Sequence, residues 1–409
     1  MERTHSDILV AGGGIAGMIA TACFAAAGFE TTCIEPQAQA PDEGAADADL
    51  RSTAFLEPAI ALLKAAGVWE RLSPHATDLR IMRLADAGGE TNEMREVADF
   101  DASTLGQARF GVNLPNVQIR KVLLEHLDTL PGATLLTGRK VVRATARTRE
   151  MILTLDDGTQ HATPLAVAAD GRNSFLRQNA GIKARRWDYG QQALVFAVSH
   201  PVPHDNVSTE IHRTGGPFTL VPLPDRGGVP HSAVVWMETG PKAAALAALP
   251  AEDFNRAATE RSCGILGPLE LATGRGRWPI SSLIAERLDG PRVALVAEAA
   301  HVMPPIGAQG LNTSLGDLSD LLGLVAAARD AGQDHGAHQI LARYSKGRHG
   351  ETLARVLGVD ALNRAAMAES QGLRDLRRAG LKLLYGLRPL REGAMRAGLG
   401  AGRLPDPGA

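Results

Sequence analysis

The sequence predicts an α/β protein with a parallel, helix-covered sheet, an inserted and mostly antiparallel sheet, and a helical C-terminal region. Three observations predict this arrangement. Near the N-terminus an apolar run enters a glycine-rich turn and then a helical pattern. The same succession of apolar run, glycine loop and helical pattern returns after residue 290. Strand-like runs fill much of the stretch 189–278, so a separate sheet is expected there.

The first apolar run, at residues 8–11, is typical of a strand buried on both faces, and it leads to a helix expected over 15–27. A second strand is expected over 31–34. Residues 8–29 contain no charge and are long enough for a membrane span or a signal peptide. The preceding residues are not clearly basic and several glycines interrupt the run, so a strand, turn and helix are favoured.

The turn contains G-x-G-x-x-G at Gly12, Gly14 and Gly17. In such a motif the first glycine permits a tight turn, the second lets a pyrophosphate approach the backbone, and the third lets the helix pack on the strand. Glu35 ends the second strand, where an acid binds ribose hydroxyls and repels a 2′-phosphate. This order predicts a site for FAD or NAD rather than NADP. The alternative is an ordinary turn with a surface glutamate.

Further elements follow in chain order. Helices are expected over 57–66 and 119–130, and strands over 140–147, 151–155 and 164–169, with a hairpin turn at 156–158. The clearest runs of the inserted sheet are 193–199, 218–223 and 232–238.

A late strand is expected over 292–297, and it leads through Glu298 and His301 to a glycine-containing loop. Leucines then recur at helical spacing from Leu315 to Val325, so a second phosphate or a flavin ring could sit at the start of that helix. His301 alone is more typical of a packed or loop histidine than of a catalytic base.

Composition limits the classes of function. The net charge of −2 offers no overall attraction for nucleic acid, and no metal-binding motif is present. Three cysteines cannot form a disulfide framework, which favours a reducing, cytoplasmic setting.

The C-terminal stretch 373–403 differs in net charge from the rest of the chain. It holds eight basic and two acidic residues, a net charge of +6, and leaves −8 for the remainder of the chain. Leucines alternate with these charges as in a basic amphipathic helix. We expect either a solvated helix docked on its own domain or a contact with a membrane surface or with a partner in a biosynthetic complex.

Three motifs together resemble one family: the glycine turn with Glu35, the strand-terminal Asp170-Gly171, and the segment 296–312. The chain is similar from residue 7 to about 370 to the group A flavoprotein monooxygenases of the para-hydroxybenzoate hydroxylase fold. Within that group, Pro305-Ile306-Gly307-Ala308-Gln309-Gly310-Leu311-Asn312, followed by Asp317, resembles the ubiquinone-biosynthesis hydroxylases of the UbiH/UbiF/UbiL type.

The resemblance implies FAD as cofactor, with no catalytic side chain assigned and no metal. Glu35 would hold the adenosine ribose, Arg51 and Arg120 would lie along FAD, and Asp170 would lie near both FAD and the nicotinamide donor. The alternative for Arg51 and for Arg120 is a charged side chain that faces solvent and does not contact FAD. The cofactor-binding residues expected in full are Gly12, Gly14, Ala16, Gly17, Glu35, Arg51, Arg120, Asp170, Gly171, Glu298, Pro305, Gly307, Gln309, Gly310, Leu311 and Asn312.

The resemblance also implies the division of the chain. Residues 1–78, 105–180 and 280–335 would form a discontinuous FAD-binding domain, 79–104 and 181–279 a substrate domain, and 336–409 a C-terminal helical region. The substrate would lie between the inserted sheet and the flavin. Phe218, Leu220 and Trp236 are candidates for its lining, with core packing the favoured alternative for each.

Four positions depart from the family pattern. Glu298 stands where the family usually has Asp, and Pro304, Ala308 and Ser314 replace His, Gly and Gly. These differences resemble the UbiL-type branch, and weakened flavin binding is the alternative.

The implied activity is hydroxylation of the ring of a polyprenylated phenol in ubiquinone biosynthesis, using NAD(P)H and O2 through a C4a-hydroperoxyflavin. Two alternatives stay open: a hydroxylase of a small soluble aromatic, and a non-catalytic flavoprotein or assembly subunit. The expected location is cytoplasmic, with a peripheral position at the inner membrane and homo-oligomerisation both left open.

Overall fold

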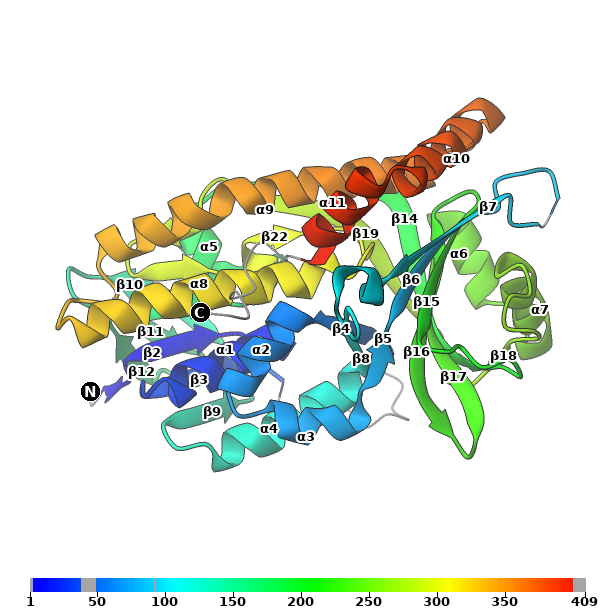
Figure 1. The fold of residues 1–409 in the computed structure, drawn as a ribbon. Helices are drawn as coiled ribbons and strands as arrows, with labels where there is room; N and C mark the ends of the chain where they lie inside the picture. The colour runs from blue at the N-terminus through cyan, green and yellow to red at the C-terminus, as the bar shows by residue number, and fades with distance from the viewer. Residues whose placement is uncertain (1–2, 38–48, 92, 400–409) are drawn as a thin grey trace.

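The computed structural model describes residues 3–37, 49–91 and 93–399. A parallel sheet and a larger, mostly antiparallel sheet lie side by side, and long C-terminal helices run across both (Figure 1). The predicted α/β class, with an inserted sheet and a helical C-terminal region, is confirmed.

The parallel sheet has six strands in the order β20-β21-β13-β2-β3-β9. All neighbours run parallel except β20, which pairs antiparallel at one edge. The expected strands are present, although the late one is shorter than its apolar run. The strands are β2 (Ile8–Ala11), β3 (Thr31–Glu35), β9 (Ala133–Thr137), β13 (Leu165–Ala168), β20 (Asp289–Gly290) and β21 (Val293–Leu295).

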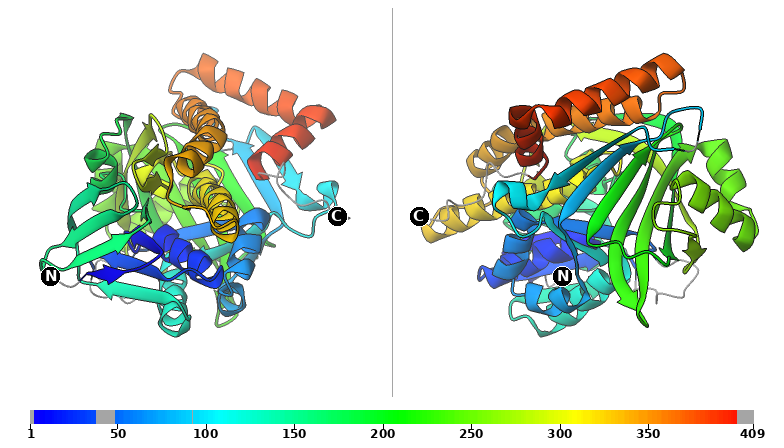
Figure 2. Two further views of the ribbon diagram at one scale, coloured as in Figure 1. Left: turned by 90° about the vertical axis from the view of Figure 1, so that its left-hand side faces the viewer. Right: turned by 45° about the vertical axis from the view of Figure 1, so that its right-hand side comes forward.

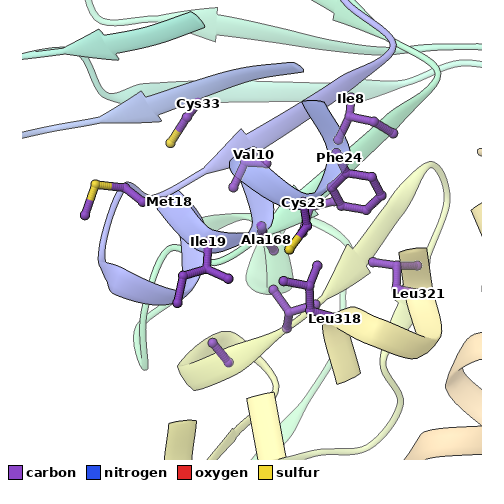
Figure 3. Packing of buried hydrophobic residues seen from close by; sticks show 14 of the residues in the cluster. Ile8, Val10, Met18, Ile19, Cys23, Phe24, Cys33, Ala168, Leu318 and Leu321 are labelled. Carbon is purple, nitrogen blue, oxygen red and sulfur yellow. The ribbon is translucent and has the colours of Figure 1, made fainter. Parts of the chain in front are cut away.

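Helix α1 (Ile15–Ala26) follows the glycine turn and packs against α4 (Asn116–Thr129) and α8 (Gln309–Asp330). Figure 3 shows side chains of α1, the parallel strands and α8 meeting in one core. The uncharged run at 8–29 is therefore a buried strand and helix, as predicted. Among the described residues, no helix combines the length and hydropathy needed to cross a bilayer.

Two small sheets complete this part of the molecule. One has the order β1-β12-β11-β10 and the other β4-β8-β5. The expected hairpin turn joins β11 to β12, with Gly158 at a φ of 85°. The strands are β1 (Thr4–His5), β4 (Ser52–Leu56), β5 (Thr77–Leu79), β8 (Gly111–Pro115), β10 (Val141–Ala146), β11 (Met151–Leu155) and β12 (Gln160–Thr163).

The large sheet has nine strands in the order β22-β19-β14-β17-β16-β15-β6-β7, with β18 paired to β14. Its pairs are antiparallel apart from β15 with β6. The strands are β6 (Ile81–Asp86), β7 (Glu96–Asp101), β14 (Ala184–Ser199), β15 (Val207–His212), β16 (Pro217–Arg226), β17 (Val229–Thr239), β18 (Glu270–Leu271), β19 (Gly276–Ala285) and β22 (His301–Val302).

The stretch 189–278 is not entirely strand-like, which corrects the expectation. Helices α6 (Gly240–Ala247) and α7 (Ala251–Arg261) interrupt it and cover one face of the large sheet, seen at the right of Figure 1. The alanine-rich sequence after Pro241 favours a helix, so the sequence itself contained a signal from which α6 could have been predicted.

Phe218, Leu220 and Trp236 pack on that covered face with Phe254 of α7, so they are core residues. Side chains alternate along a strand, and the opposite face of β17 presents Val235 and Met237 instead.

Three helices end the described part of the chain: α9 (His338–Ala366), α10 (Gln371–Gly386) and α11 (Arg388–Leu399). Both views of Figure 2 place α10 and α11 on the outside of the molecule. The remaining short elements are α2 (Glu57–Ala65), α3 (Trp69–Leu72), α5 (Phe175–Asn179) and the 3₁₀ turns η1 (Ser73–His75), η2 (Ala102–Leu105) and η3 (Ala297–Ala299). The division into domains stays a prediction.

Candidate functional site

Three of the sequence motifs follow the carboxyl ends of neighbouring parallel strands. The glycine turn follows β2, Asp170-Gly171 follows β13, and Glu298 follows β21. Strand β13 pairs with both β2 and β21, so the three ends share one edge of the sheet. In open α/β sheets ligands bind outside the carboxyl ends of the strands.

The glycine turn is packed tightly on one side and open on the other. A β-carbon on Gly17 would lie 1.8 Å from the carbonyl oxygen of Gly12, and one on Gly12 would lie 2.4 Å from that of Ala169. A β-carbon on Gly14 would have no neighbour within 4 Å. Gly14 precedes the first residue of α1, where free backbone N–H groups favour an anion. The turn thus leaves room for a phosphate at Gly14.

Glu35 and Arg120 flank this turn from two other elements. The Glu35 carboxylate, at the end of β3, accepts a hydrogen bond from the N–H of Gly13 at 2.6 Å. Arg120 on α4 donates Nη1–H to the carbonyl oxygen of Gly13 at 3.1 Å. Its Nε–H is buried without a partner among the described residues. Arg120 is therefore more than a solvated charge on a helix face.

Asp170 lies beside the turn. Its Oδ2 accepts the N–H of Leu176 at 3.1 Å, whereas its Oδ1 is buried and finds no partner within the described chain. Burial raises the pKa of Asp170, and hydrogen bonds from Ser174 and the backbone only partly offset that effect. Gly171 has a φ of 81° and open space at its β-position. An unpartnered carboxylate oxygen beside an open backbone position is suited to a hydroxyl-bearing ligand.

Glu298 reaches Arg172, a residue that the sequence analysis did not single out. The two side chains form an ion pair with N–O distances of 3.2 and 3.3 Å. Arg172 immediately follows the Asp170-Gly171 pair, so this contact joins the second strand end to the third. The longer side chain of Glu298 is therefore engaged at the same edge of the sheet.

The segment from Pro305 to Asn312 forms a turn and the first residues of α8. Gly307 and Ala308 both have positive φ, at 61° and 57°. Gln309 donates Nε2–H to the carbonyl oxygens of Gly307 and Gly398, and its Oε1 accepts from Arg355. A β-carbon on Gly310 would be unobstructed, and Pro305 is exposed.

Asn312 fastens this segment to β4. Its Oδ1 accepts the N–H of Leu56 at 2.9 Å, and its Nδ2 donates to the carbonyl oxygens of Ala54 and Ala308, each at 2.7 Å. Both ends of the amide are thus occupied by backbone groups, which indicates a positioning role for Asn312.

Arg51 precedes β4 and is held by a neighbouring carboxylate and an aromatic ring. Its guanidinium makes two hydrogen bonds to Asp49, both of 2.7 Å, and stacks 4.3 Å above the Trp278 ring. Burial alone would lower the pKa of Arg51, but Asp49 and the charge of Glu298 raise it. The sequence analysis missed Asp49 as its partner, although the two residues lie close in sequence.

A buried ionic cluster supports the third strand end. Asp317 on α8 accepts from His301 at 2.7 Å and from Arg348 of α9 at 2.6 Å, and all three side chains are at most 2% exposed. Burial would raise the pKa of Asp317, but His301 and Arg348 hold it below its usual value. His301 is therefore a packed histidine, as expected. Arg348 lies on α9, 31 residues after Asp317, and nothing in the sequence indicated that the two side chains would pair.

Comparison with known proteins identifies the family. The FAD binding domain family matches residues 5–355. The chain belongs to this family. It is an FAD-dependent monooxygenase, and NAD(P)H is the usual co-substrate of such enzymes. The resemblance to the flavoprotein monooxygenases that the sequence motifs indicated is thereby confirmed.

Curated relatives cover most of the chain. Ubiquinone hydroxylase UbiL of Rhodospirillum rubrum is 32% identical over 362 residues, which are 88% of this chain and 81% of the relative. The 3-demethoxyubiquinol 3-hydroxylase of Escherichia coli is 26% identical, over 88% of this chain and 90% of the enzyme.

Solved structures share the fold. The p-nitrophenol 4-monooxygenase PnpA from Pseudomonas putida has a TM-score of 0.76 at 19% identity, with 98% of each chain covered. PqsL from Pseudomonas aeruginosa, described as a probable FAD-dependent monooxygenase, has a TM-score of 0.75 at 21% identity, over 92% of this chain and 99% of PqsL.

The residues at the sheet edge fit FAD. Gly14 leaves open space for a pyrophosphate at a helix start, Glu35 stands at the end of β3, and Asp170 and Arg120 each keep one buried polar atom without a partner in the described chain. These features come from four separate elements and face one edge.

Proposed function

We propose that this monooxygenase hydroxylates the aromatic ring of a polyprenylated phenol in ubiquinone biosynthesis, with NAD(P)H and O2 as co-substrates. The observation that carries the proposal is the 32% identity, over 88% of the chain, to a ubiquinone hydroxylase. Its support in the structure is the convergence of the glycine turn, Asp170 and Glu298 at one sheet edge.

The proposed cofactor contacts follow from the open positions. Gly12, Ala16 and Gly17 shape the turn, and the pyrophosphate passes Gly14. Glu35 accepts ribose hydroxyls, Asp170 offers its unpartnered Oδ1, and Arg120 offers its unpartnered Nε–H. Bound FAD would supply the redox chemistry, with NAD(P)H as the electron donor and O2 as the source of the oxygen atom.

We place the substrate ring where the third strand end meets the large sheet. Met303 and Ile306, just before Gly307, pack in one apolar cluster with Ala193, Val195 and Met237 of the sheet. This is the face opposite to the one covered by α7. An apolar boundary of this kind orients a ring and excludes water from the reacting centre.

The decisive test combines a purified protein with a deletion strain. The protein should be yellow and should oxidise NAD(P)H faster when a polyprenylated phenol is added. The strain lacking the gene should accumulate a ring-unhydroxylated quinone precursor, and the wild type should restore the pool. An unchanged quinone pool would instead favour a small soluble aromatic substrate. Complementation with Glu298→Asp then shows whether the Arg172 contact requires the longer side chain.

A further inference from the structure

Two polar side chains lie on the face of the large sheet that we assign to the substrate. Thr219 of β16 is paired with Glu210 of β15 on one side and with Val235 of β17 on the other. Val235 packs against the apolar cluster that contains Met303 and Ile306. Directly paired residues of antiparallel strands point to the same face of a sheet. The row that begins at Val235 therefore continues to a hydroxyl and a carboxylate.

The hydroxyl group of Thr219 is buried without a hydrogen-bond partner in the described chain. Its strand neighbours Phe218 and Leu220 belong to the core on the other face, under α7, so the threonine is not part of that core. Most buried polar groups in proteins are paired, and a buried hydroxyl without a partner costs free energy. A ligand with a hydrogen-bonding group at this position would remove that cost.

Glu210 presents a carboxylate beside this hydroxyl. The residue is 8% exposed, and its Oε1 accepts a hydrogen bond from Nε2 of His212 at 2.7 Å. Because a carboxylate only accepts hydrogen bonds, the proton of this contact is on Nε2. The other ring nitrogen of His212, Nδ1, is buried and has no partner among the described residues. His212 thus orients Glu210 and occupies only one of its two carboxylate oxygens.

The surroundings of these groups indicate the class of ligand. Val235 and Leu84 of β6 flank Thr219 and Glu210 on the same face, and both are apolar. A ligand on this row is therefore largely apolar and carries one group that both donates and accepts a hydrogen bond. A phenol has this composition. An aromatic acid or a phosphate would bring a negative charge toward Glu210 and would be repelled.

We propose that Thr219 and Glu210 bind the ring hydroxyl of the substrate, an assignment that rests on the proposed function, and that they select a phenol over an aromatic ring without a free hydroxyl. Glu210 accepts the phenol O–H, and Thr219 donates its hydroxyl hydrogen to the phenol oxygen. One group of the ligand thereby satisfies both side chains. The hydrogen bond to the carboxylate is the stronger of the two because its acceptor is charged.

The test is ligand binding by the FAD-loaded protein in detergent, with flavin absorbance as the readout and NAD(P)H left out. The probes are a polyprenylated phenol and its O-methyl ether, which cannot donate a hydrogen bond to Glu210. The wild type should bind the phenol at least about tenfold more tightly than the ether. Thr219→Val should weaken phenol binding by about threefold to tenfold, and Glu210→Gln by about tenfold or more. Neither variant should weaken binding of the ether.

Three comparisons separate recognition of the hydroxyl from damage to the fold. Thr219→Ser keeps a hydroxyl and should keep most of the affinity for the phenol. Thr209→Val removes a hydroxyl from β15 at the residue paired with Leu220, on the face covered by α7, and should leave both affinities unchanged. Thr219→Val apoprotein should melt at the wild-type temperature or above, because the hydroxyl that it removes is buried without a partner in the described chain.

An unchanged preference for the phenol in Thr219→Val and Glu210→Gln would overturn the assignment and leave the proposed function intact. An equal loss of phenol affinity in Thr209→Val would also overturn it, because the effect would not depend on the face of the sheet. A wild type that binds the ether as tightly as the phenol would refute selection by the hydroxyl. A wild type that binds neither probe would contradict the proposed function as well.

Discussion

Asn312 and Leu56 lie 256 positions apart, yet the side-chain oxygen of Asn312 accepts the backbone N–H of Leu56 at 2.9 Å. The same amide donates to Ala54 and Ala308. This contact ties the start of α8 to β4, so the turn before α8 has a defined place relative to the parallel sheet.

Substitution of Asn312 tests this clamp. Asn312→Ala leaves the Leu56 N–H without its acceptor, which should cost about 1–3 kcal/mol of unfolding free energy and loosen the turn at Gly307. Asn312→Asp keeps the acceptor but sets a carboxylate oxygen against the carbonyl oxygens of Ala54 and Ala308, so its cost should be at least as large as that of alanine. Urea unfolding and FAD titration measure the two consequences. An alanine variant with wild-type stability would contradict the positioning role.

Gly14→Ala separates cofactor binding from folding. Gly14 has an ordinary φ of −65° and open space at its β-position, so alanine should leave the unfolding free energy of the apoprotein unchanged. The added methyl group would occupy the proposed path of the pyrophosphate, and FAD affinity should fall by about tenfold or more. Gly17→Ala is the contrasting variant, because it collides with Gly12 and should destabilise the fold itself. Unaltered FAD affinity in Gly14→Ala would remove the pyrophosphate from this turn.

Asp170 should make both stability and FAD affinity depend on pH. Burial raises its pKa in the folded protein, so ionisation opposes folding as the pH rises above the unfolded-state pKa of about 3.9. Asp170→Asn should therefore stabilise the apoprotein at neutral pH, and the gain should vanish at lower pH. If the carboxylate accepts a hydroxyl of FAD, wild-type affinity should rise with pH while the variant stays flat. Denaturant unfolding and FAD titrations between pH 4 and 8 measure the pH dependence of stability and of FAD affinity. If Asp170→Asn destabilised the apoprotein at neutral pH, the raised pKa of Asp170 would be contradicted.

Ionisation of Asp317 should stabilise the folded protein, whereas ionisation of Asp170 should destabilise it. The pKa of Asp317 is lowered by His301 and Arg348 against the effect of burial, so its stabilising contribution is full above about pH 4 and is lost as the pH falls through the folded-state pKa. Asp317→Asn removes the buried partner of Arg348 and leaves that guanidinium only the more exposed carboxylates of Glu351 and Asp320, which should cost about 3 kcal/mol at pH 7. Denaturant unfolding at pH 7 and at successively lower pH measures the difference. Equal stability at pH 7 would refute the assignment.

The two faces of the large sheet should respond differently to substitution. Val235→Phe enlarges a side chain on the face that we assign to the substrate and should raise the KM for the phenol by about tenfold. Trp236→Phe changes the neighbouring residue on the face covered by α7 and should lower stability without altering KM. The reverse pattern in steady-state kinetics would move the substrate to the other face.

Local pattern predicted much of this fold. The strand, glycine turn and helix at the N-terminus depend mainly on contacts between near neighbours. Gly17 is required by its approach to Gly12 within the turn, whereas Gly12 is required by its approach to Ala169 after β13. The strand expected over 232–238 is present within β17, but the sequence did not predict which of its faces is covered, because that depends on helices α6 and α7, which were not predicted. Trp236 accordingly belongs to the core.

Long-range partners were beyond prediction. Arg172 meets Glu298, and Arg348 meets Asp317, only because β13 pairs with β21 and α9 packs against α8. Neither pairing leaves a trace in spacing or composition. The roles of the predicted cofactor residues follow the family resemblance, and the structure adds which of their polar atoms are still without a partner in the described chain.

We propose that this chain transfers one oxygen atom from O2 to a polyprenylated phenol. The most direct measurement is the mass of the product formed by the purified, FAD-loaded protein with NAD(P)H, that phenol and isotopically heavy O2. The product should carry one heavy oxygen atom and should not form without NAD(P)H. Consumption of NAD(P)H with no heavy oxygen in the phenol would contradict it.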